Sequence, residues 1–133
     1  MPLIHIPQET NTDCLPCCIA MVLDQTREVV LSWFVGRESD DTGVMVDVLS
    51  TKGYIVEEVD SPGEAGGLRR ILGLVNKNSE GHAVVMDDDE SIVDPRSKAT
   101  TKKYLLDYSG TGYVVDRVFI IRKKEMVGTG QAP

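Results

Sequence analysis

The spacing of apolar residues changes about halfway along the chain. In the first half they recur every three or four positions behind polar capping residues, a pattern that predicts amphipathic helices. In the second half, β-branched and alternating apolar runs predict strands joined by polar turns. Helices are predicted over residues 14–24, between Thr26 and Gly36, and over residues 44–51, 68–72 and 100–108. Strands are predicted over residues 54–59, 82–86, 90–95 and 113–122, and another strand is predicted to begin at residue 74. Residues 3–6 are predicted to form an extended segment or a short strand.

Helices early in the chain and antiparallel strands late in it predict an α+β fold, in which N-terminal helices pack on a C-terminal antiparallel sheet. The length of 133 residues suits one domain with a substantial hydrophobic core. We therefore expect a single domain over residues 1–127. Residues 128–133 contain two glycines and a final proline, and are expected to form a flexible tail.

A cysteine stands where a polar loop leads directly into the first apolar helix. Either Thr12 or Asp13 can cap this helix, and Pro16 fits its first turn, where a missing amide hydrogen costs nothing. Cys14 is thereby placed at the helix N-terminus, where free amides and the helix dipole favour an anion. This environment suits a nucleophilic thiolate, although a lone cysteine is more often a buried structural thiol.

A second candidate pair lies in the hairpin predicted over residues 82–95. His82 begins its first strand and Asp94 ends its second. If the two side chains lie directly opposite each other, Val84 pairs with Ile92 and residues 87–89 form a three-residue loop. A two-residue turn would place Asp94 on the other face of the sheet. We therefore predict the three-residue loop and contact between His82 and Asp94.

The cysteines and the acidic residues of the hairpin also allow metal-binding hypotheses. Cys14, Cys17 and Cys18, with His5 or His82, offer four zinc ligands, but a second C-x2-C pair is missing and adjacent helical thiols converge poorly on a tetrahedron. The acidic run at residues 87–90 lacks the glycine of an EF-hand loop. We expect no metal and no cofactor.

Charge and composition narrow the classes of partner. The net charge of −7 and a pI near 4.7 argue against a nucleic-acid surface, which needs clustered Lys and Arg. The N-terminus lacks the basic and apolar regions of a signal peptide, and no apolar run could span a membrane. Three closely spaced cysteines make a poor disulfide framework and suit a reducing compartment. We expect a cytoplasmic protein that binds neither nucleic acid nor membrane.

The order and spacing of these residues resemble the papain-like cysteine peptidases, most closely the double-glycine-leader (bacteriocin-processing) peptidase family and its stand-alone relatives. Gln8 stands six residues before Cys14, as the oxyanion-hole glutamine of that superfamily does before its nucleophile. His82 opens a Gly-His-apolar strand, and Asp94-Pro95 matches the Asp-Pro of the third catalytic residue. The helix signature of the family is matched by Asp13, Cys14, Cys18, Ala20 and Met21.

The resemblance implies a papain-like fold and a peptide substrate, and each residue type suits its implied role. The Cys14 thiolate would attack an acyl carbon, and His82 would share the thiol proton and protonate the leaving group. Asp94 would orient His82. Gln8 and the amide of Cys14 would bind the oxyanion, a role in which one donor contributes about 3 to 4 kcal/mol. We therefore expect a cysteine peptidase.

Leu15 departs from the family pattern, because a small residue, typically glycine, follows the nucleophile there, and a leucine could reshape the groove. Two alternative functions stay open from the sequence. The same residues serve deamidases and transglutaminase-like acyl transferases, which differ in the amide attacked or in the nucleophile that resolves the thioester. A papain-like domain could also be a catalytically silent binding module that uses its groove for a partner.

Overall fold

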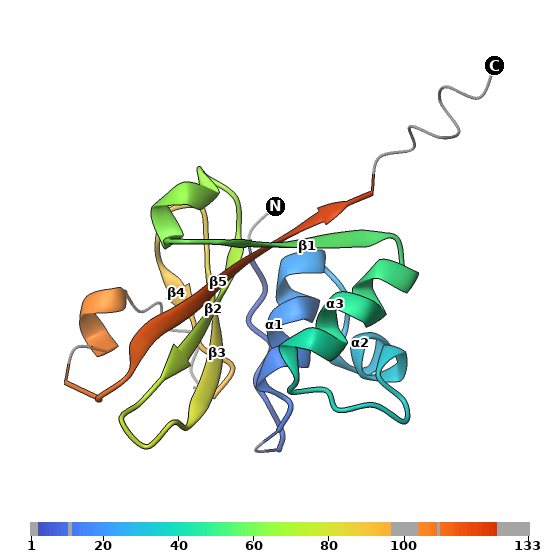
Figure 1. Ribbon diagram of the computed structural model, residues 1–133, viewed down its shortest axis with the longest axis horizontal. Coiled ribbons are helices and arrows are strands. Elements are labelled where there is room, and N and C mark those ends of the chain that lie inside the picture. Colours follow the sequence, from blue (N-terminus) through green and yellow to red (C-terminus); the bar gives the residue numbers. More distant parts are fainter. Residues whose placement is uncertain (1–2, 11, 97–103, 109, 125–133) are drawn as a thin grey trace.

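The computed structural model describes residues 3–10, 12–96, 104–108 and 110–124. Three N-terminal helices lie beside one five-stranded antiparallel sheet, whose strand order is β1-β5-β2-β3-β4 (Figure 1). The elements in chain order are α1 (Cys14–Leu23), α2 (Arg27–Trp33), α3 (Thr42–Thr51), β1 (Tyr54–Val59), the 3-10 helix η1 (Pro62–Ala65), β2 (Arg70–Val75), β3 (Gly81–Met86), β4 (Ile92–Val93), the 3-10 helix η2 (Leu105–Tyr108) and β5 (Val114–Lys123). The α+β class expected from the sequence is confirmed.

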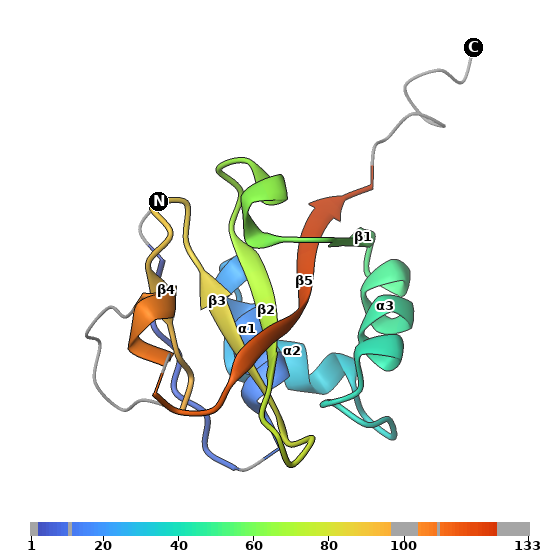
Figure 2. The same cartoon turned by 60° about the vertical axis from the view of Figure 1, so that its left-hand side comes forward.

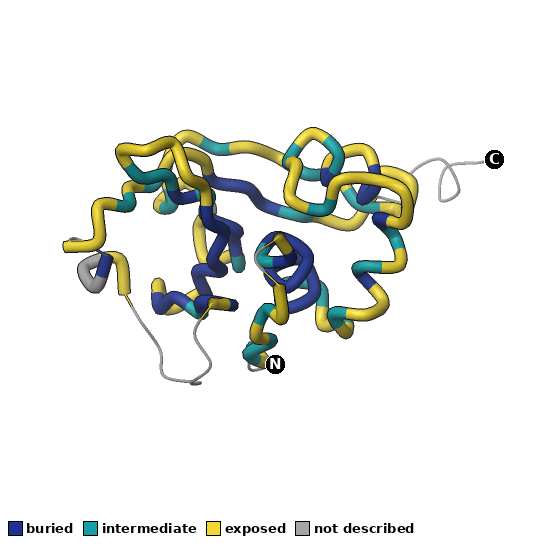
Figure 3. The backbone as a smooth tube through the Cα atoms, turned by 90° about the horizontal axis from the view of Figure 1, so that it is seen from below, coloured by how far each residue is buried: buried dark blue, intermediate teal, exposed yellow. Residues whose placement is uncertain are grey.

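The main core lies between the helices and one face of the sheet. Helix α1 packs on β3 and β2, α2 packs on α1, and α3 packs on β1. Figure 2 shows α1 behind β2 and β3, and Figure 3 shows buried residues gathered where the helices meet the sheet. Fully buried side chains in this core include Ile19, Met45, Leu49 and Val85. Helix α1 is therefore fixed against the strands that carry the candidate histidine.

A second, smaller core covers the other face of the sheet. Alternate residues of β3, Val84 and Met86, contribute to it, together with Ile92 of β4. Tyr108 at the end of η2 packs against this cluster and is itself buried. The segment that follows β4 thereby returns to the sheet close to the hairpin.

The helix boundaries follow the capping residues of the sequence in two helices of three. Thr26 caps α2 by accepting a hydrogen bond from the amide of Val29, and the Asp41 side chain caps α3. Helix α1 begins at Cys14 as predicted. Asp13 occupies its N-cap position, yet its carboxylate makes no capping hydrogen bond to α1. The predicted capping role of Asp13 is wrong, and its carboxylate binds elsewhere.

The helix predicted over residues 68–72 is wrong. These residues lead into β2, the central strand, which pairs with β5 on one side and β3 on the other. Ile71 and Leu72 point into the two opposite cores. Residues with good helix propensity are held in a strand because both faces of β2 are buried. Residues 3–6 form no strand. The structure describes the final turn of the helix predicted over residues 100–108, as η2. Residues 100–103 and 128–133 lie outside the described residues.

The hairpin loop has three residues, as predicted, but lies one residue later in the chain. Met86 pairs with Ile92, and the amide of Asp87 donates to the carbonyl of Ser91, so residues 88–90 form the tip. Glu90 adopts a left-handed conformation with φ of 68°, which is typical of the last position of a three-residue hairpin loop. A shift of the loop by one residue moves the pairing by two positions. The faces of His82 and Asp94 are therefore preserved although the predicted pairing of Val84 with Ile92 is wrong.

Candidate active site

A groove of about 420 Å³ lies between the start of α1 and the sheet. Cys14 and Leu15 line it from α1, and His82 lines it from β3. Opposite β2, strand β5 carries an extra residue, Asp116, in a bulge that also lines the groove. The groove thus brings a thiol at a helix N-terminus and an imidazole at a strand start to one surface.

A second hollow, of about 430 Å³, lies between the N-terminal segment and the start of α2. Its described lining includes Ile6, Met21 and Arg27, and contains neither cysteine nor histidine. Because nucleophilic and acid-base chemistry need such groups, we place the candidate active site in the groove at Cys14.

His82 and Asp94 are in direct contact, as the sequence predicted. His82 Nε2 lies 2.7 Å from Asp94 Oδ1, and both side chains are almost completely buried. A carboxylate oxygen accepts hydrogen bonds, so Nε2 carries the hydrogen of this pair. Nδ1, the other ring nitrogen, is buried and has no hydrogen-bond partner among the described residues. That nitrogen is available to exchange a proton with a reacting group.

Cys14 is the side chain that brings a thiol to His82. It is partly exposed, whereas Cys17 and Cys18 are completely buried. Burial lowers the pKa of His82, but the hydrogen bond with Asp94, an interaction with the Cys14 thiol and the Asp94 charge together raise it above its usual value. Cys14 and His82 line the same groove, and contacts between catalytic side chains often tighten only when a substrate binds.

Tyr108 is a site residue that the sequence analysis missed. Its hydroxyl donates to Asp94 Oδ2 at 2.6 Å, while the amide of Arg96 donates to Oδ1 at 2.8 Å. Burial raises the pKa of Asp94, but its hydrogen bonds and the charge of His82 lower it to about 2 overall. Both oxygens of the carboxylate are thus bonded, which holds it ionised and in one orientation. A tyrosine fourteen residues beyond an aspartate carries no sequence signal of this contact.

Replacing Tyr108 by phenylalanine is expected to lower the free energy of unfolding by about 1.5 to 3 kcal/mol, because a buried hydrogen bond to a charged group is lost. Urea unfolding at pH 7 measures this difference. Tyr54→Phe is a matched control, since its hydroxyl has no hydrogen-bond partner among the described residues, and a change below about 0.5 kcal/mol is expected there. Equal effects of the two substitutions would show that the bond to Asp94 does not stabilise the fold.

The His82–Asp94 pair also predicts how stability depends on pH. The pKa of Asp94 is lowered to about 2 by folding, so its contribution is complete above about pH 4 and is lost as the pH falls toward 2. The raised pKa of His82 adds stability that is complete below about pH 6.5 and is lost as the pH rises through the folded value. In urea unfolding from pH 2 to 9, we expect up to about 2 kcal/mol to disappear on the acid side. Asp94→Asn, the control, should lack this part of the pH dependence.

Gln8 is placed beside the site by its main chain. Its amide donates to the carbonyl of Pro95 at 2.7 Å, which joins the N-terminal loop to the segment that follows Asp94. Its side-chain nitrogen donates to the carbonyl of Thr10 at 2.8 Å, which uses one of its two hydrogens. Gln8 is not among the residues that line the groove. Its predicted contact with an oxyanion therefore stays a prediction.

His5, taken from the sequence as incidental, also anchors this segment. Its Nε2 lies 3.0 Å from the carbonyl oxygen of Asp94. Together with the Gln8–Pro95 bond, this contact fastens the extended N-terminal segment to the chain around Asp94. No motif in the sequence predicts the contact, because it joins positions far apart in the chain.

The zinc hypothesis finds no support in the positions of the thiols. Cys17 and Cys18 are buried in α1, and burial is the main cause that raises the pKa of Cys17 to about 12. Among the described residues, the one group of potential ligands whose donor atoms converge consists of Asp87, Asp88 and Asp89. Asp87 is already paired with Arg69 at 3.0 Å.

Leu15, which departs from the family pattern, is largely buried in the main core and also lines the groove.

Comparison with known proteins identifies the fold. No protein family and no curated protein matches the chain by sequence. Among solved structures, the chain matches a double glycine motif protease from an AMS/PCAT transporter, which was solved in complex with the leader peptide. The chain has the papain-like α+β fold of that protease. The TM-score is 0.64 at 18% sequence identity, over 92% of this chain and 93% of that one. Within the described residues, no helix combines the length and apolar character needed to cross a membrane.

Proposed function

We propose that this protein is a cysteine peptidase that cleaves a peptide amide through Cys14, His82 and Asp94, with Gln8 as an oxyanion donor. The observation that carries the proposal is the buried His82–Asp94 hydrogen bond of 2.7 Å beside a partly exposed cysteine at a helix N-terminus. A histidine fixed in this way has a defined hydrogen on one nitrogen and an open position on the other. That arrangement serves proton transfer to and from a neighbouring thiol.

In the proposed reaction, His82 Nδ1 takes the proton of Cys14, and the thiolate sulfur attacks the carbonyl carbon of the peptide. The carbonyl π electrons move to oxygen, and the resulting oxyanion accepts hydrogen bonds from the amide of Cys14 and the carboxamide of Gln8. As the tetrahedral intermediate collapses, the C–N bond breaks and His82 protonates the leaving amine. Water, deprotonated by His82, then hydrolyses the thioester and the proton returns to Cys14.

A peptide with small residues before the cut is the proposed substrate class. The structural relative is a double glycine motif protease and was solved with its leader peptide bound. In this chain, Gly73, Gly81 and Ala83 line the groove beside His82. Such small side chains leave room for a peptide backbone to approach closely. We therefore propose glycine at the residues directly before the cleaved bond.

Cleavage of a defined peptide tests the proposal. A synthetic peptide of about 20 residues with a central Gly-Gly is incubated with the wild-type protein and with Cys14→Ala, and products are measured by intact mass. Two fragments whose masses sum to the peptide plus one water, formed by the wild type alone, are expected. The peptide also carries one glutamine and one lysine, so that a gain of about one dalton without cleavage would show deamidation, and the mass of two peptides less one ammonia would show acyl transfer between them. An unchanged peptide that still binds the protein would identify a silent binding module.

A further inference from the structure

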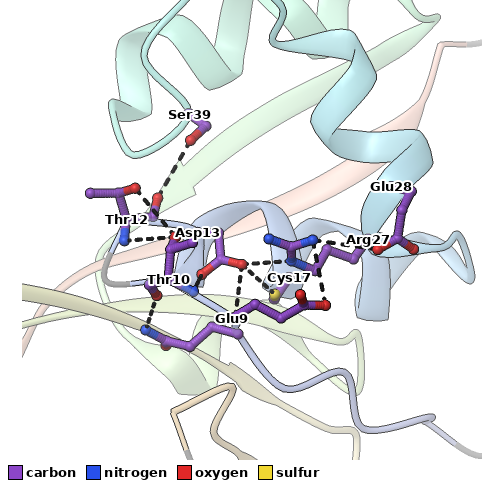
Figure 4. A network of polar contacts seen from close by, with 9 residues as sticks. Glu9, Thr10, Thr12, Asp13, Cys17, Arg27, Glu28 and Ser39 are labelled. Carbon is purple, nitrogen blue, oxygen red and sulfur yellow. Dashed lines mark hydrogen bonds and ion pairs between the residues drawn. The ribbon is translucent and has the colours of Figure 1, made fainter.

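The loop that connects Gln8 to Cys14 is held by one buried carboxylate (Figure 4). Asp13 is 2% exposed, although it stands at the start of α1, where an aspartate usually caps its own helix. Its Oδ2 accepts from the amide of Glu9 and its Oδ1 from the amide of Thr10, each at 3.0 Å. Oδ2 also accepts from the Cys17 thiol at 3.9 Å, so the carboxylate joins the preceding loop to the start of α1.

Arg27, the first residue of α2, compensates the charge of this buried carboxylate. Its Nε donates to Asp13 Oδ2 at 2.6 Å, and its side chain is itself largely buried. Burial raises the pKa of Asp13, but the bonds from the Glu9 amide, Arg27 and the Thr10 amide lower it below its usual value. A buried carboxylate that lost this partner would keep an uncompensated charge. Asp13 and Arg27 therefore act as one unit.

The contacts continue from this unit to Gln8. Thr10, whose amide is held by Asp13, accepts the side-chain hydrogen bond of Gln8 on its carbonyl at 2.8 Å. The other end of the loop is fixed by the bond from the Gln8 amide to Pro95. The orientation of the Gln8 carboxamide thus depends on Thr10, and the position of Thr10 depends on Asp13.

The direction of the Asp13 side chain has a second effect at Cys14. A capping aspartate would accept hydrogen bonds from the first amides of α1, and the negative charge would lie against the helix N-terminus. Asp13 makes no such bond. Its main-chain carbonyl instead accepts from the amide of Cys17 at 3.1 Å, which starts the helix. Because the carboxylate is not hydrogen-bonded to the first amides of α1, its negative charge does not occupy the helix N-terminus, where the amide of Cys14 can donate to a ligand.

We propose that Asp13, held by Arg27, is a positioning residue for oxyanion binding, which fixes the loop so that the Gln8 carboxamide and the Cys14 amide address one acyl oxygen. The inference rests on the proposed function, because it assumes that Cys14 forms a tetrahedral adduct. Asp13 touches neither the thiol of Cys14 nor the substrate. Its effect passes through Gln8 and through the start of α1.

Two thiol reagents separate this role from activation of the thiol. The aldehyde acetyl-glycyl-glycinal forms a hemithioacetal: the Cys14 sulfur bonds to the aldehyde carbon, the π electrons move to oxygen, and the thiol proton ends on that oxygen. Iodoacetamide forms a sulfur–carbon bond and releases iodide, and no carbonyl oxygen gains charge in that step. Oxyanion donors therefore affect aldehyde affinity and leave the alkylation rate nearly unchanged.

Four proteins form the test: wild type, Gln8→Ala, Asp13→Asn and the double variant. We expect the aldehyde Kd to rise about 100-fold in Gln8→Ala and at least about tenfold in Asp13→Asn, with iodoacetamide rates at Cys14 within about threefold of wild type. If Asp13 acts through Gln8, the loss in the double variant is smaller than the product of the two single losses. Losses that multiply fully, or an unchanged Kd in Asp13→Asn, would overturn the inference.

Stability controls keep the test decisive. Asp47→Asn removes an exposed ion pair with Arg37 outside the site and should leave the Kd unchanged. If Asp13→Asn does not fold, as judged by circular dichroism, Arg27→Gln replaces it, because that variant keeps the carboxylate and its two amide bonds. At least about a threefold rise in the aldehyde Kd is then expected. No rise in Kd would overturn the inference. If wild type itself forms no aldehyde adduct, the proposed function fails, whereas a normal response to Gln8→Ala with none to Asp13→Asn overturns the positioning role alone.

Discussion

Replacing His82 by alanine is expected to slow cleavage of the Gly-Gly peptide by about 100- to 10,000-fold, the range that a general acid-base group contributes. The reason is structural: Asp94 fixes one nitrogen of His82 at 2.7 Å, and the other nitrogen is buried without a partner among the described residues. His5, the other histidine of the chain, is not among the described residues that line the groove. Initial rates of peptide cleavage, measured by liquid chromatography at pH 7, give the ratio of kcat/KM values.

The other histidine of the chain provides the matched control for this loss. His5 contacts the main-chain carbonyl of Asp94 and not its carboxylate. His5→Ala is therefore expected to reduce kcat/KM by less than about tenfold, through altered anchoring of the N-terminal segment. If His82→Ala keeps more than a tenth of wild-type activity, or if His5→Ala loses as much as His82→Ala, His82 is not the acid-base group.

The largest effect on stability is expected for Ile19→Ala, which should lower the free energy of unfolding by about 2 to 5 kcal/mol. Ile19 is completely buried in the core between α1 and the sheet, so its truncation leaves a cavity that the surrounding strands cannot fully close. Domains of this size are stable by about 5 to 15 kcal/mol, and the loss is a large part of that. Urea unfolding followed by circular dichroism measures it.

Val35→Ala is the matched control for the core substitution, because Val35 is 80% exposed and also loses apolar atoms. We expect a change within about 0.5 kcal/mol. A cost below about 1 kcal/mol for Ile19→Ala would mean that α1 is not held on the sheet by this packing. The position of Cys14 relative to His82 would then need another explanation, since Cys14 is placed by the packing of α1 on β3, the strand that carries His82.

The sequence predicted the parts of the fold that local chemistry determines. Helix α2 begins directly after Thr26, because a short polar side chain before an apolar helix satisfies a free amide. The start of α1 at Cys14 followed from Pro16, because a proline fits the first turn of a helix, where its missing amide hydrogen costs nothing. The sequence also predicted that His82 and Asp94 lie on one face of the hairpin, because side chains alternate with a period of two residues and a shift of the pairing by two positions keeps that face.

The parts that failed depend on contacts between distant residues. Residues 68–72 have the composition of a helix, and β2 exists because β3 and β5 pair with it on both sides. The hairpin loop lies one residue later than predicted and ends at Glu90, which adopts a left-handed conformation. A glutamate in the sequence does not predict this conformation, because residues other than glycine rarely adopt it. Tyr108 reaches Asp94 only through the fold, and Asp13 turned away from its own helix to meet Arg27.

The rate of Cys14 alkylation by iodoacetamide at neutral pH, in wild type and in His82→Ala, most directly tests whether His82 activates this thiol. Peptide mapping assigns the label among the three cysteines, and the buried Cys17 and Cys18 serve as internal references. If His82 activates Cys14, the wild type is labelled there first and the substitution slows labelling at least about tenfold. Equal rates in the two proteins, or labelling spread evenly over the three cysteines, would contradict a Cys14–His82 catalytic pair.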